Sequence, residues 1–328
     1  EDVSPGVDGQ SLRQPMGVFA AITPYNFPPM VPLWFYPYAI ATGNTFVLKT
    51  SEQVPLSQMR MVELLHETGL PPGVLNLVHG GKEAVNALCT HPDVVGVSFV
   101  GSSAVARHVF RTCGEQGKRV QALGGAKNFM IVTPSAVMDR SVANVADSIY
   151  GCAGQRCLAG AVVVGVGTAF EPVRERLLAA ARAIVVGDGA RPGVTLGPVI
   201  SAAHRDRIFA YIEKGVQEGA SLLLDGRTVH VEGLENGFFV GPTVFDNVTP
   251  DMAIATEEIF GPVACLMRAD TLSEAIDMAN RSAYGNSSSL YSNDGREARE
   301  FVHRIRAGML GINVGVPAPM AYFPFGGQ

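Results

Sequence analysis

The chain has 328 residues, of which 47% are hydrophobic and 17% are charged, and its formal net charge is −5 at pH 7. This composition is typical of a globular protein with room for two domains, and it excludes an intrinsically disordered chain. The acidic balance provides no basic surface for nucleic acid or for an anionic membrane, so we expect neither as a partner.

The five cysteines are scattered and odd in number, which argues against a disulfide framework. They fit a reducing compartment, which is the cytoplasm or, in a eukaryote, the mitochondrial matrix. The seven histidines lack a zinc-binding spacing and no CxxC motif occurs, so we expect no metal. We also find no apolar run that reads as a signal peptide or a membrane span.

The first third of the chain alternates between short apolar runs and amphipathic segments. Such alternation predicts a parallel sheet that is covered by helices on both faces. The expected strands are 45–49, 74–78 and 94–100, and the expected helices are 55–69, 82–90 and one that begins after Gly101.

The same pattern resumes after residue 126 and predicts a second α/β unit. Thr271 and Glu274 form a capping box ahead of an apolar helix face. We therefore expect an α/β protein with two doubly wound parallel-sheet domains, residues 1–125 and 126–328, joined without a long linker. The expected elements of the second domain are strands 128–132, 161–166 and 310–316 and helices 138–151, 271–279 and 298–305.

Two strand ends in the first domain carry residues that suit a nucleotide. FVGSS (Phe99–Ser103) ends a strand and begins a helix, so Gly101 and Ser102 could approach a phosphate. Without a full GxGxxG motif, an ordinary strand-to-helix turn is the better reading of these residues alone. Lys49 and Glu52 could hold a ribose, although a solvated charge pair explains them equally simply.

PYNFPP places Asn26 on a stiff, proline-rich turn after a predicted strand. A rigid side-chain amide is a good donor to a developing oxyanion. The alternative is an asparagine that satisfies the backbone of its own turn.

Cys157 lies in YGCAGQRCLAG, where the charged neighbour Arg156 and the glycines are unusual around a structural cysteine. The thiolate is the reactive form, and Arg156 or a helix N-terminus would lower the thiol pKa. Cys152 is the rival nucleophile, but it has no cation next to it in sequence. A buried spectator role for Cys157 stays open on these residues alone.

The motifs TPYNFP, LKTSE, FVGSS, ALGG, GQRC, EEIFGP and FPFGG occur together in this order. In this respect the chain resembles the NAD(P)-dependent aldehyde dehydrogenase superfamily over nearly its whole length. QALGGAKN, GCAGQRC and NVGVPAPMAYFPF are similar to the methylmalonate-semialdehyde dehydrogenase branch, which uses NAD and coenzyme A. An acidic Glu52 would favour NAD over NADP, because it would repel a 2′-phosphate.

The resemblance implies an aldehyde dehydrogenase-like fold, with a partial, Rossmann-like NAD-binding domain at 1–125 and a catalytic domain at 126–328. It also implies an oligomerisation strand near the start, family segments missing at both ends, and a homodimer or homotetramer in the full-length form. By position the resemblance implies that Cys157 is the nucleophile and that Asn26 donates to the oxyanion. It implies that NAD is held by Lys49 and Glu52 at the adenosine ribose, by Gly101 and Ser102 at the pyrophosphate, by Glu258 at the nicotinamide ribose and by Phe260 beside the nicotinamide ring. It also implies that Arg156 and Phe323 contact the substrate.

Hydrolytic members of the superfamily carry a glutamate base where this chain has Ala122. Alanine cannot take a proton from water, whereas the thiol of CoA needs less activation than water does. The missing base favours transfer to CoA, and the resemblance implies that the reaction is oxidation of malonate or methylmalonate semialdehyde with decarboxylation, giving acetyl-CoA or propanoyl-CoA. The alternatives are a hydrolytic enzyme that uses another base and an inactive truncated remnant.

Overall fold

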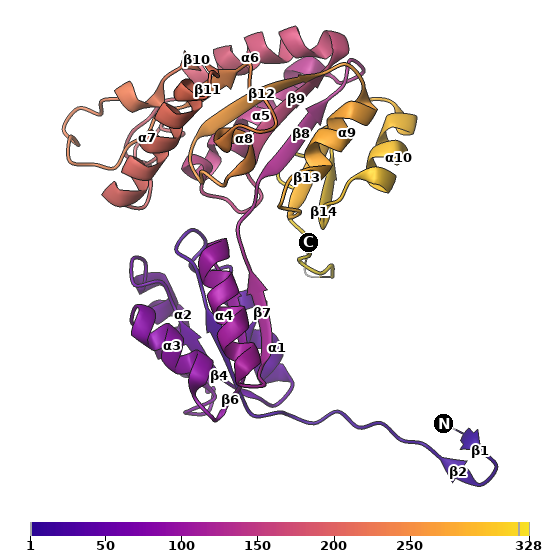
Figure 1. The fold of residues 1–328 in the computed structure, drawn as a ribbon. Coiled ribbons are helices and arrows are strands. Elements are labelled where there is room, and N and C mark those ends of the chain that lie inside the picture. The colour runs from indigo at the N-terminus through magenta and orange to yellow at the C-terminus, as the bar shows by residue number, and fades with distance from the viewer. Residues whose placement is uncertain (1, 321, 328) are drawn as a thin grey trace. The chain divides into compact units, whose positions relative to one another are not determined.

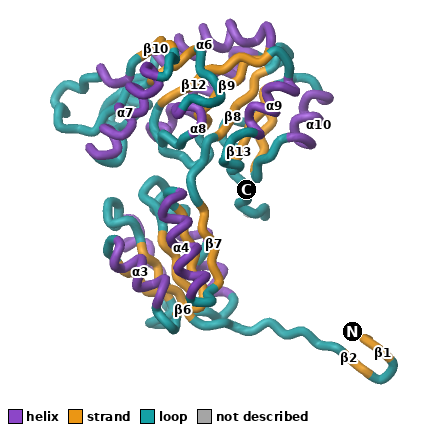
Figure 2. The backbone as a smooth tube through the Cα atoms, viewed as in Figure 1, coloured by secondary structure: helices purple, strands orange, loops and turns teal. Residues whose placement is uncertain are grey.

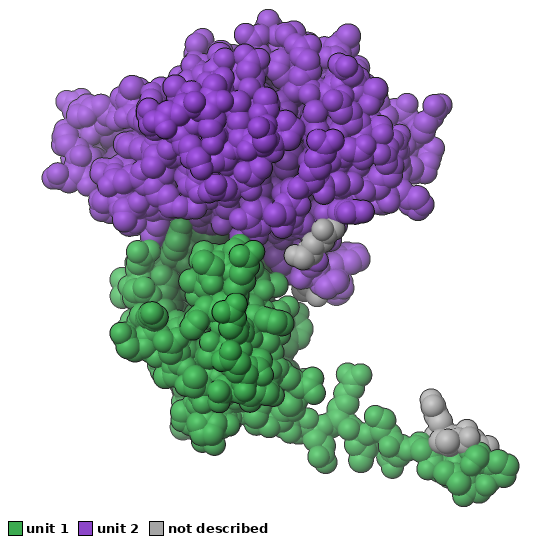
Figure 3. All heavy atoms as spheres, in the orientation of Figure 1, with its two compact units in different colours: residues 1–124 green, residues 125–328 purple. Residues whose placement is uncertain are grey.

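The computed structural model describes residues 2–320 and 322–327 of the chain. The chain forms two compact units with their boundary between Gly124 and Gly125, one residue before the boundary expected from sequence (Figure 3). In the described part of the chain, no helix is both long and apolar enough to cross a membrane.

Unit 1 is built on a parallel sheet with the strand order β5-β4-β3-β6-β7 (Figure 1). From β3 the chain moves through β4 to β5 in one direction across the sheet, and it then returns to the other side of β3 to form β6 and β7. Because the crossovers are right-handed, α1 and α2 lie on one face of the sheet and α3 and α4 lie on the other. The bounds are β3 Val18–Ile22, β4 Thr45–Lys49, β5 Leu75–Val78, β6 Val94–Val100, β7 Arg119–Leu123, η1 Pro32–Trp34, α1 Tyr36–Ala41, α2 Leu56–Glu67, α3 Lys82–Thr90 and α4 Ser103–Glu115.

The alternation of side chains along β3 explains why this unit has two cores. Ala20 and Ile22 pack into a cluster with residues of α3 and α4, such as Val109. Ala21 points the other way and packs with Tyr36 of α1 and Val62 of α2. Each face of the sheet is therefore sealed by its own pair of helices.

Unit 2 contains a larger sheet with the strand order β10-β11-β12-β9-β8-β13-β14 (Figure 2). Its strand pairs are parallel except for β10 with β11. The bounds are β8 Asn128–Val132, β9 Gly160–Val166, β10 Ser221–Leu224, β11 Thr243–Asp246, β12 Val263–Ala269, β13 Ser287–Tyr291, β14 Met309–Ile312, α5 Met138–Tyr150, α6 Phe170–Arg182, α7 Ala202–Gln217, α8 Ala253–Thr256, α9 Leu272–Asn280, α10 Gly295–Arg304, η2 Gly151–Gly154, η3 Gly167–Ala169 and η4 Gly226–Thr228.

The central strands of unit 2 are apolar throughout because both of their faces are covered. All five residues of β8 are buried, and β9 reads GAVVVGV. The step from β8 to β9 and the step from β12 to β13 run in opposite directions across the sheet, so α5 and α9 lie on opposite faces (Figure 1). The resulting architecture is the doubly wound α/β fold expected from sequence.

Several details depart from the sequence reading. The predicted capping box at Thr271 is half formed, because Glu274 accepts from Asp270 N–H rather than from the cap residue. The strand expected at 310–316 ends at Ile312, where Asn313 takes a left-handed φ of 56°. Near the start of the chain, β1 (Asp2–Ser4) pairs with β2 (Val7–Asp8) in an antiparallel hairpin. The oligomerisation role of that segment stays a prediction.

The core of unit 2 can be tested with two matched valine-to-alanine changes on helices. Val173 of α6 is fully buried, whereas Val302 of α10 is 50% exposed. We expect Val173→Ala to lower the free energy of unfolding by about 2 kcal/mol, because methyl groups leave the core and a cavity remains. Val302→Ala should change it by less than about 0.5 kcal/mol. Urea unfolding followed by circular dichroism measures both, and equal losses would contradict the placement of Val173.

Candidate active site

The turn that leads to Cys157 has an unusual backbone. After α5, Cys152, Ala153 and Gly154 take positive φ angles of 55°, 53° and 70° in succession. Each non-glycine residue in this region costs about 1–2 kcal/mol, so the surrounding structure must hold the turn in place. Gly154 has no alternative, because a Cβ there would lie 2.2 Å from the carbonyl oxygen of Gly261.

Two asparagine side chains fix the backbone carbonyl of Cys157. Asn128 Nδ2, at the start of β8, donates to it over 2.9 Å, and Asn286 Nδ2, just before β13, donates to it over 2.9 Å. Asn128 also donates to the Ala159 carbonyl (2.8 Å) and accepts from Ser287 N–H (3.1 Å). The loop that carries Cys157 is thus tied to the starts of two neighbouring strands, β8 and β13.

The structure differs from the sequence reading in the ionisation of Cys157. Burial raises the pKa of its thiol to about 11, the N–H groups of Cys157 and Leu158 lower that pKa, and Glu258 adds to the rise. The expectation that a neighbouring cation would lower the Cys157 pKa is therefore not met in this structure.

Arg156 turns toward α5 instead. Its Nη1 lies 3.7 Å from the Asp147 carboxylate and donates to the Asp147 carbonyl over 3.4 Å. Burial raises the pKa of Cys152 as well, but Arg156 opposes that rise. The cation that sequence assigned to Cys157 thus acts on its rival Cys152.

A small cavity of about 20 Å³ joins the functional groups of unit 2. Its lining includes Arg156, Cys157, Glu258 and Phe260, and also Lys127 and Asn128. The Nζ of Lys127 is buried and donates no hydrogen bond to any described residue. Burial lowers the pKa of this ammonium, and Cys265 and Glu258 oppose that effect.

The carboxylate of Glu258 is held from two sides. It accepts from Ala126 N–H over 2.8 Å, and a Cβ on Gly125 would lie 2.4 Å from its Oε2, so a side chain at this position would push the carboxylate aside. Burial raises the pKa of Glu258, and the Ala126 N–H opposes the rise.

The backbone around Glu258 is secured by α7. Arg207 donates to the carbonyls of Glu258 (2.7 Å) and Ile259 (3.1 Å). The ring of His204 lies 2.8 Å from the Phe260 carbonyl and within hydrogen-bonding reach of it. Phe260 itself has a φ of 61°, so these contacts stabilise a backbone conformation that phenylalanine rarely adopts.

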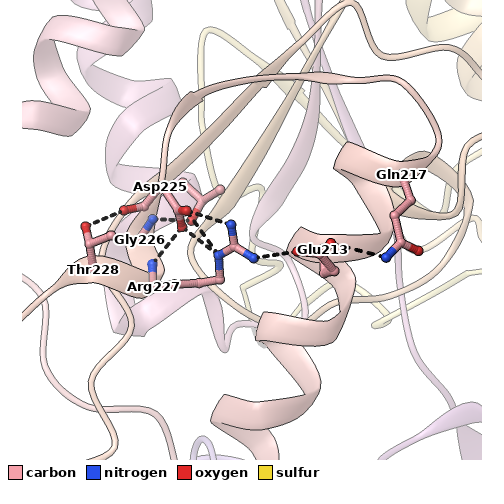
Figure 4. A network of polar contacts seen from close by, with 7 residues as sticks. Glu213, Gln217, Asp225, Gly226, Arg227 and Thr228 are labelled. Carbon is pink, nitrogen blue, oxygen red and sulfur yellow. Dashed lines mark hydrogen bonds and ion pairs between the residues drawn. The ribbon is translucent and has the colours of Figure 1, made fainter.

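The far part of α7 is anchored by a polar network around Arg227 (Figure 4). Arg227 donates to both carboxylate oxygens of Asp225 and reaches Glu213 of α7 over 2.9 Å. Gln217 also donates to Glu213, over 3.2 Å. The helix that carries Arg207 and His204 is therefore fixed along its length.

Unit 1 holds the other residues proposed from sequence. Lys49, at the end of β4, is buried and pairs with Glu52 over 3.0 Å. A bond from the Glu52 backbone N–H, and after it the pairing with Lys49, hold the pKa of that carboxyl below its usual range. Ser102 precedes α4, and its hydroxyl makes no capping bond. Gly101 N–H donates to the Leu123 carbonyl. Asn26 is half-buried in the bend after β3.

Two further positions bear on the sequence reading. Ala122 lies in β7, and neither of its neighbours, Gln121 and Leu123, carries a carboxylate. Phe323 is 67% exposed and is not among the residues that line the cavity with Cys157. Its role in substrate binding stays a prediction.

Within unit 2 the structure brings together Arg156, Cys157, Glu258 and Phe260, which sequence assigned from separate motifs. Sequence reasoning missed Lys127, Asn128, Asn286, Arg207 and His204. One signal was available, since an asparagine that opens a fully buried strand must find hydrogen-bond partners.

The chain matches the model of the aldehyde dehydrogenase family over residues 1–328. It belongs to that family. A malonate-semialdehyde dehydrogenase from Halalkalibacterium halodurans is 51% identical over 326 residues, which cover 99% of this chain and 67% of that protein. A second one, from Geobacillus thermodenitrificans, is 52% identical with the same coverage. The chain thus spans about two thirds of the length of these relatives.

Solved structures of the family have the same fold. A methylmalonate-semialdehyde dehydrogenase from Oceanimonas doudoroffii superimposes with a TM-score of 0.97 at 46% identity, covering 100% of this chain and 67% of that one. An aldehyde dehydrogenase from Mycobacterium tuberculosis, complexed with NAD+, gives a TM-score of 0.92 at 36% identity, covering 96% of this chain and 64% of that one. The doubly wound arrangement of both sheets is therefore that of the family.

The electrostatic effect of Glu258 on Cys157 can be tested by Glu258→Gln. Removing the negative charge should lower the Cys157 thiol pKa and raise its alkylation rate at pH 8 about threefold. Iodoacetamide labelling, resolved by peptide mass spectrometry, measures this rate. The matched control is Glu257→Gln, the adjacent exposed carboxylate, which should leave the rate unchanged; a slower reaction in Glu258→Gln would contradict the assignment.

Proposed function

We propose that this protein catalyses the NAD-dependent oxidation of malonate or methylmalonate semialdehyde, with loss of carbon dioxide and transfer of the acyl group to CoA. The observation that carries the proposal is a cysteine held rigidly beside Arg156 and Glu258, in a chain with no carboxylate at 121–123. The names of the relatives, malonate-semialdehyde dehydrogenase and methylmalonate-semialdehyde dehydrogenase, support the same substrate class.

Cys157 is the proposed nucleophile. Its loop is fixed by the left-handed turn and by two amide donors, so the sulfur stands at a defined position on the cavity. The thiol passes its proton to solvent before the sulfur attacks, because the thiolate is the nucleophilic form. Attack of the sulfur on the aldehyde carbon leaves an oxyanion, for which the Cys157 N–H and the Asn26 amide are the proposed donors.

The residues present fit NAD. Unit 1 offers Gly101 and Ser102 at the start of α4, a 13-residue helix whose N-terminus suits a pyrophosphate, and Lys49 with Glu52 suit ribose hydroxyls. In unit 2, Glu258 is the proposed partner of the nicotinamide ribose, and Phe260 is the proposed neighbour of the ring. When bound, NAD supplies the hydride acceptor that turns the adduct on Cys157 into a thioester.

Release from Cys157 favours CoA over water. Water needs a general base to attack a thioester at neutral pH, and residues 121–123 supply none. A CoA thiol is partly ionised at neutral pH and exchanges directly with the thioester. Before this exchange the β-carboxylate leaves as carbon dioxide, because the thioester carbonyl accepts the electron pair, and the resulting enolate takes a proton from solvent at its α-carbon.

Arg156 is the proposed partner of the substrate carboxylate. It lines the cavity with Cys157, and among the described residues its guanidinium forms an ion pair with Asp147 alone, at 3.7 Å; the Asp147 side chain is 75% exposed. An exposed ion pair of this length is weak, so the guanidinium can exchange it for a bidentate bond to a substrate. Phe323 stays a proposed apolar contact for the same substrate.

The requirement for CoA can be measured directly. We expect NADH formation from malonate semialdehyde to need CoA and to yield acetyl-CoA, identified by mass spectrometry, and Cys157→Ser to abolish it. A free-acid product without CoA would instead assign the protein to the hydrolytic class. The absence of NADH, even in a single-turnover burst, would favour an inactive chain.

Recognition by Arg156 predicts an effect that depends on the substrate. Arg156→Gln should raise KM for malonate semialdehyde about 10- to 100-fold, because a charge-assisted bond to the carboxylate is lost. KM for propanal, which has no carboxylate, should stay within about twofold. Arg156→Lys keeps the charge but lacks the planar guanidinium. Its KM for malonate semialdehyde should therefore lie between that of the unchanged protein and that of Arg156→Gln. Equal increases for both aldehydes would contradict this role.

A further inference from the structure

Unit 2 has a second cavity, of about 570 Å³, which lies at the carboxyl ends of the parallel strands β11 and β12 and beside the start of α6. Cys157 lies at the opposite ends of the strands, just before β9. Val263 lines the Cys157 cavity and Arg268 lines the second one, and both belong to β12. Because a parallel strand rises about 3.3 Å per residue, these two positions are about 16 Å apart, and the cavities are separate.

The size and position of this cavity, which we call the β11–β12 pocket, suit a small molecule. Its volume lies within the range of about 300–1,000 Å³ that is typical of ligand pockets. In open α/β sheets, ligands bind in crevices outside the carboxyl ends of the strands, which is where this pocket lies.

Part of the pocket is apolar. The apolar residues that line it are Phe170, Val248, Pro250, Leu266, Met267 and Met278. They come from the start of α6, the loop after β11, β12 itself and α9. A hydrocarbon chain that lies against them leaves water, which favours its binding.

Two arginines of the pocket converge on one carboxylate. Glu171 accepts from Arg174 Nη1 over 2.7 Å and from Arg268 Nη2 over 2.5 Å. The Cζ of Arg268 lies 4.3 Å from the centroid of the Phe170 ring, so the guanidinium is stacked beside the apolar wall. Among the described residues, Arg268 donates only to Glu171, and its other N–H groups are available to a ligand.

The two carboxylates of the pocket are held with different firmness. The Asp246 side chain is only 9% exposed, lies 2.8 Å from Arg174 Nε and accepts from Asn247 N–H over 2.7 Å. It is therefore part of the wall. The Glu171 side chain is 52% exposed. Ion pairs of such exposed groups contribute little stability, so an incoming anion can displace Glu171 from the arginines.

We propose that the β11–β12 pocket binds a small organic carboxylate with an apolar chain, whose carboxylate replaces that of Glu171 between Arg174 and Arg268. The class of ligand follows from the contact that the protein itself makes, since the two guanidinium groups are already spaced around a carboxylate. The N-terminus of α6 lies at the same place and also favours negative charge. This binding site is distinct from the proposed chemistry at Cys157.

The test is a titration with hexanoate, followed by the methyl resonances of 13C-methyl-labelled methionines. Met267 and Met278 line the pocket, so their signals should shift and saturate. Met130 packs against Gly160, which lines the Cys157 cavity, and its signal should stay in place. Hexan-1-ol has the same chain without the carboxylate and should bind at least about tenfold more weakly.

Two substitutions should change the affinity for hexanoate in opposite directions. Arg268→Gln should weaken binding about tenfold, because a charge-assisted hydrogen bond is lost. Glu171→Gln should strengthen binding about 3- to 10-fold, because the competing negative charge is gone. The matched control is Arg296→Gln, which changes an exposed arginine of α10 and should leave the affinity unchanged.

Three results would overturn the proposal. One is the absence of a saturable shift at Met267 and Met278, or a shift at Met130 in their place, which would locate the anion at the Cys157 cavity. The second is equal affinity for hexanoate and hexan-1-ol. The third is weaker binding of hexanoate to Glu171→Gln, which would give Glu171 a structural role. Because the titration uses no aldehyde, NAD or CoA, its result is independent of the semialdehyde activity.

Discussion

The turn from α5 into β9 passes through three successive left-handed residues, and the arrangement of unit 2 around Cys157 depends on it. Two of the three are not glycine, so the turn carries a conformational cost of about 1–2 kcal/mol per residue that its neighbours must offset. They do so with hydrogen bonds to the Cys157 carbonyl and with close packing of Gly154 on Gly261. Cys157 is held in place by contacts formed far from it in sequence.

A second residue with a left-handed φ, Phe260, lines the same cavity, and its backbone is likewise held by contacts from elsewhere in the chain. Its conformation is held by His204 and Arg207, and their helix is in turn held by the Arg227 network. The residues that line the cavity are thus held by polar contacts from α7, and α7 is held by further polar contacts more distant from the cavity. Such contacts are what keep reactive groups at fixed positions, and they leave little freedom at the centre.

The fold was largely accessible from sequence, because buried parallel strands are apolar along their whole length. β4, β6 and β8 begin and end where the sequence placed them. β7 and β10 were missed because they are edge strands with partly exposed residues, and β11, β12 and β13 were missed although their residues are mostly buried. For the site, local motifs identified Cys157 and Glu258. The partners of these residues could not be read, because Asn286 and Arg207 reach them only through the tertiary fold. The direction of Arg156 was likewise set by Asp147, one helix earlier.

The contact between Gly154 and Gly261 joins two loops that lie far apart in the sequence. No side chain can be added at Gly154 without displacing the backbone at Gly261. A change in the backbone of the loop that carries the Cys157 thiol would therefore require a matching change in the loop that carries Glu258. Anyone who transplants this thiol-bearing loop onto another scaffold would have to move both loops as a pair.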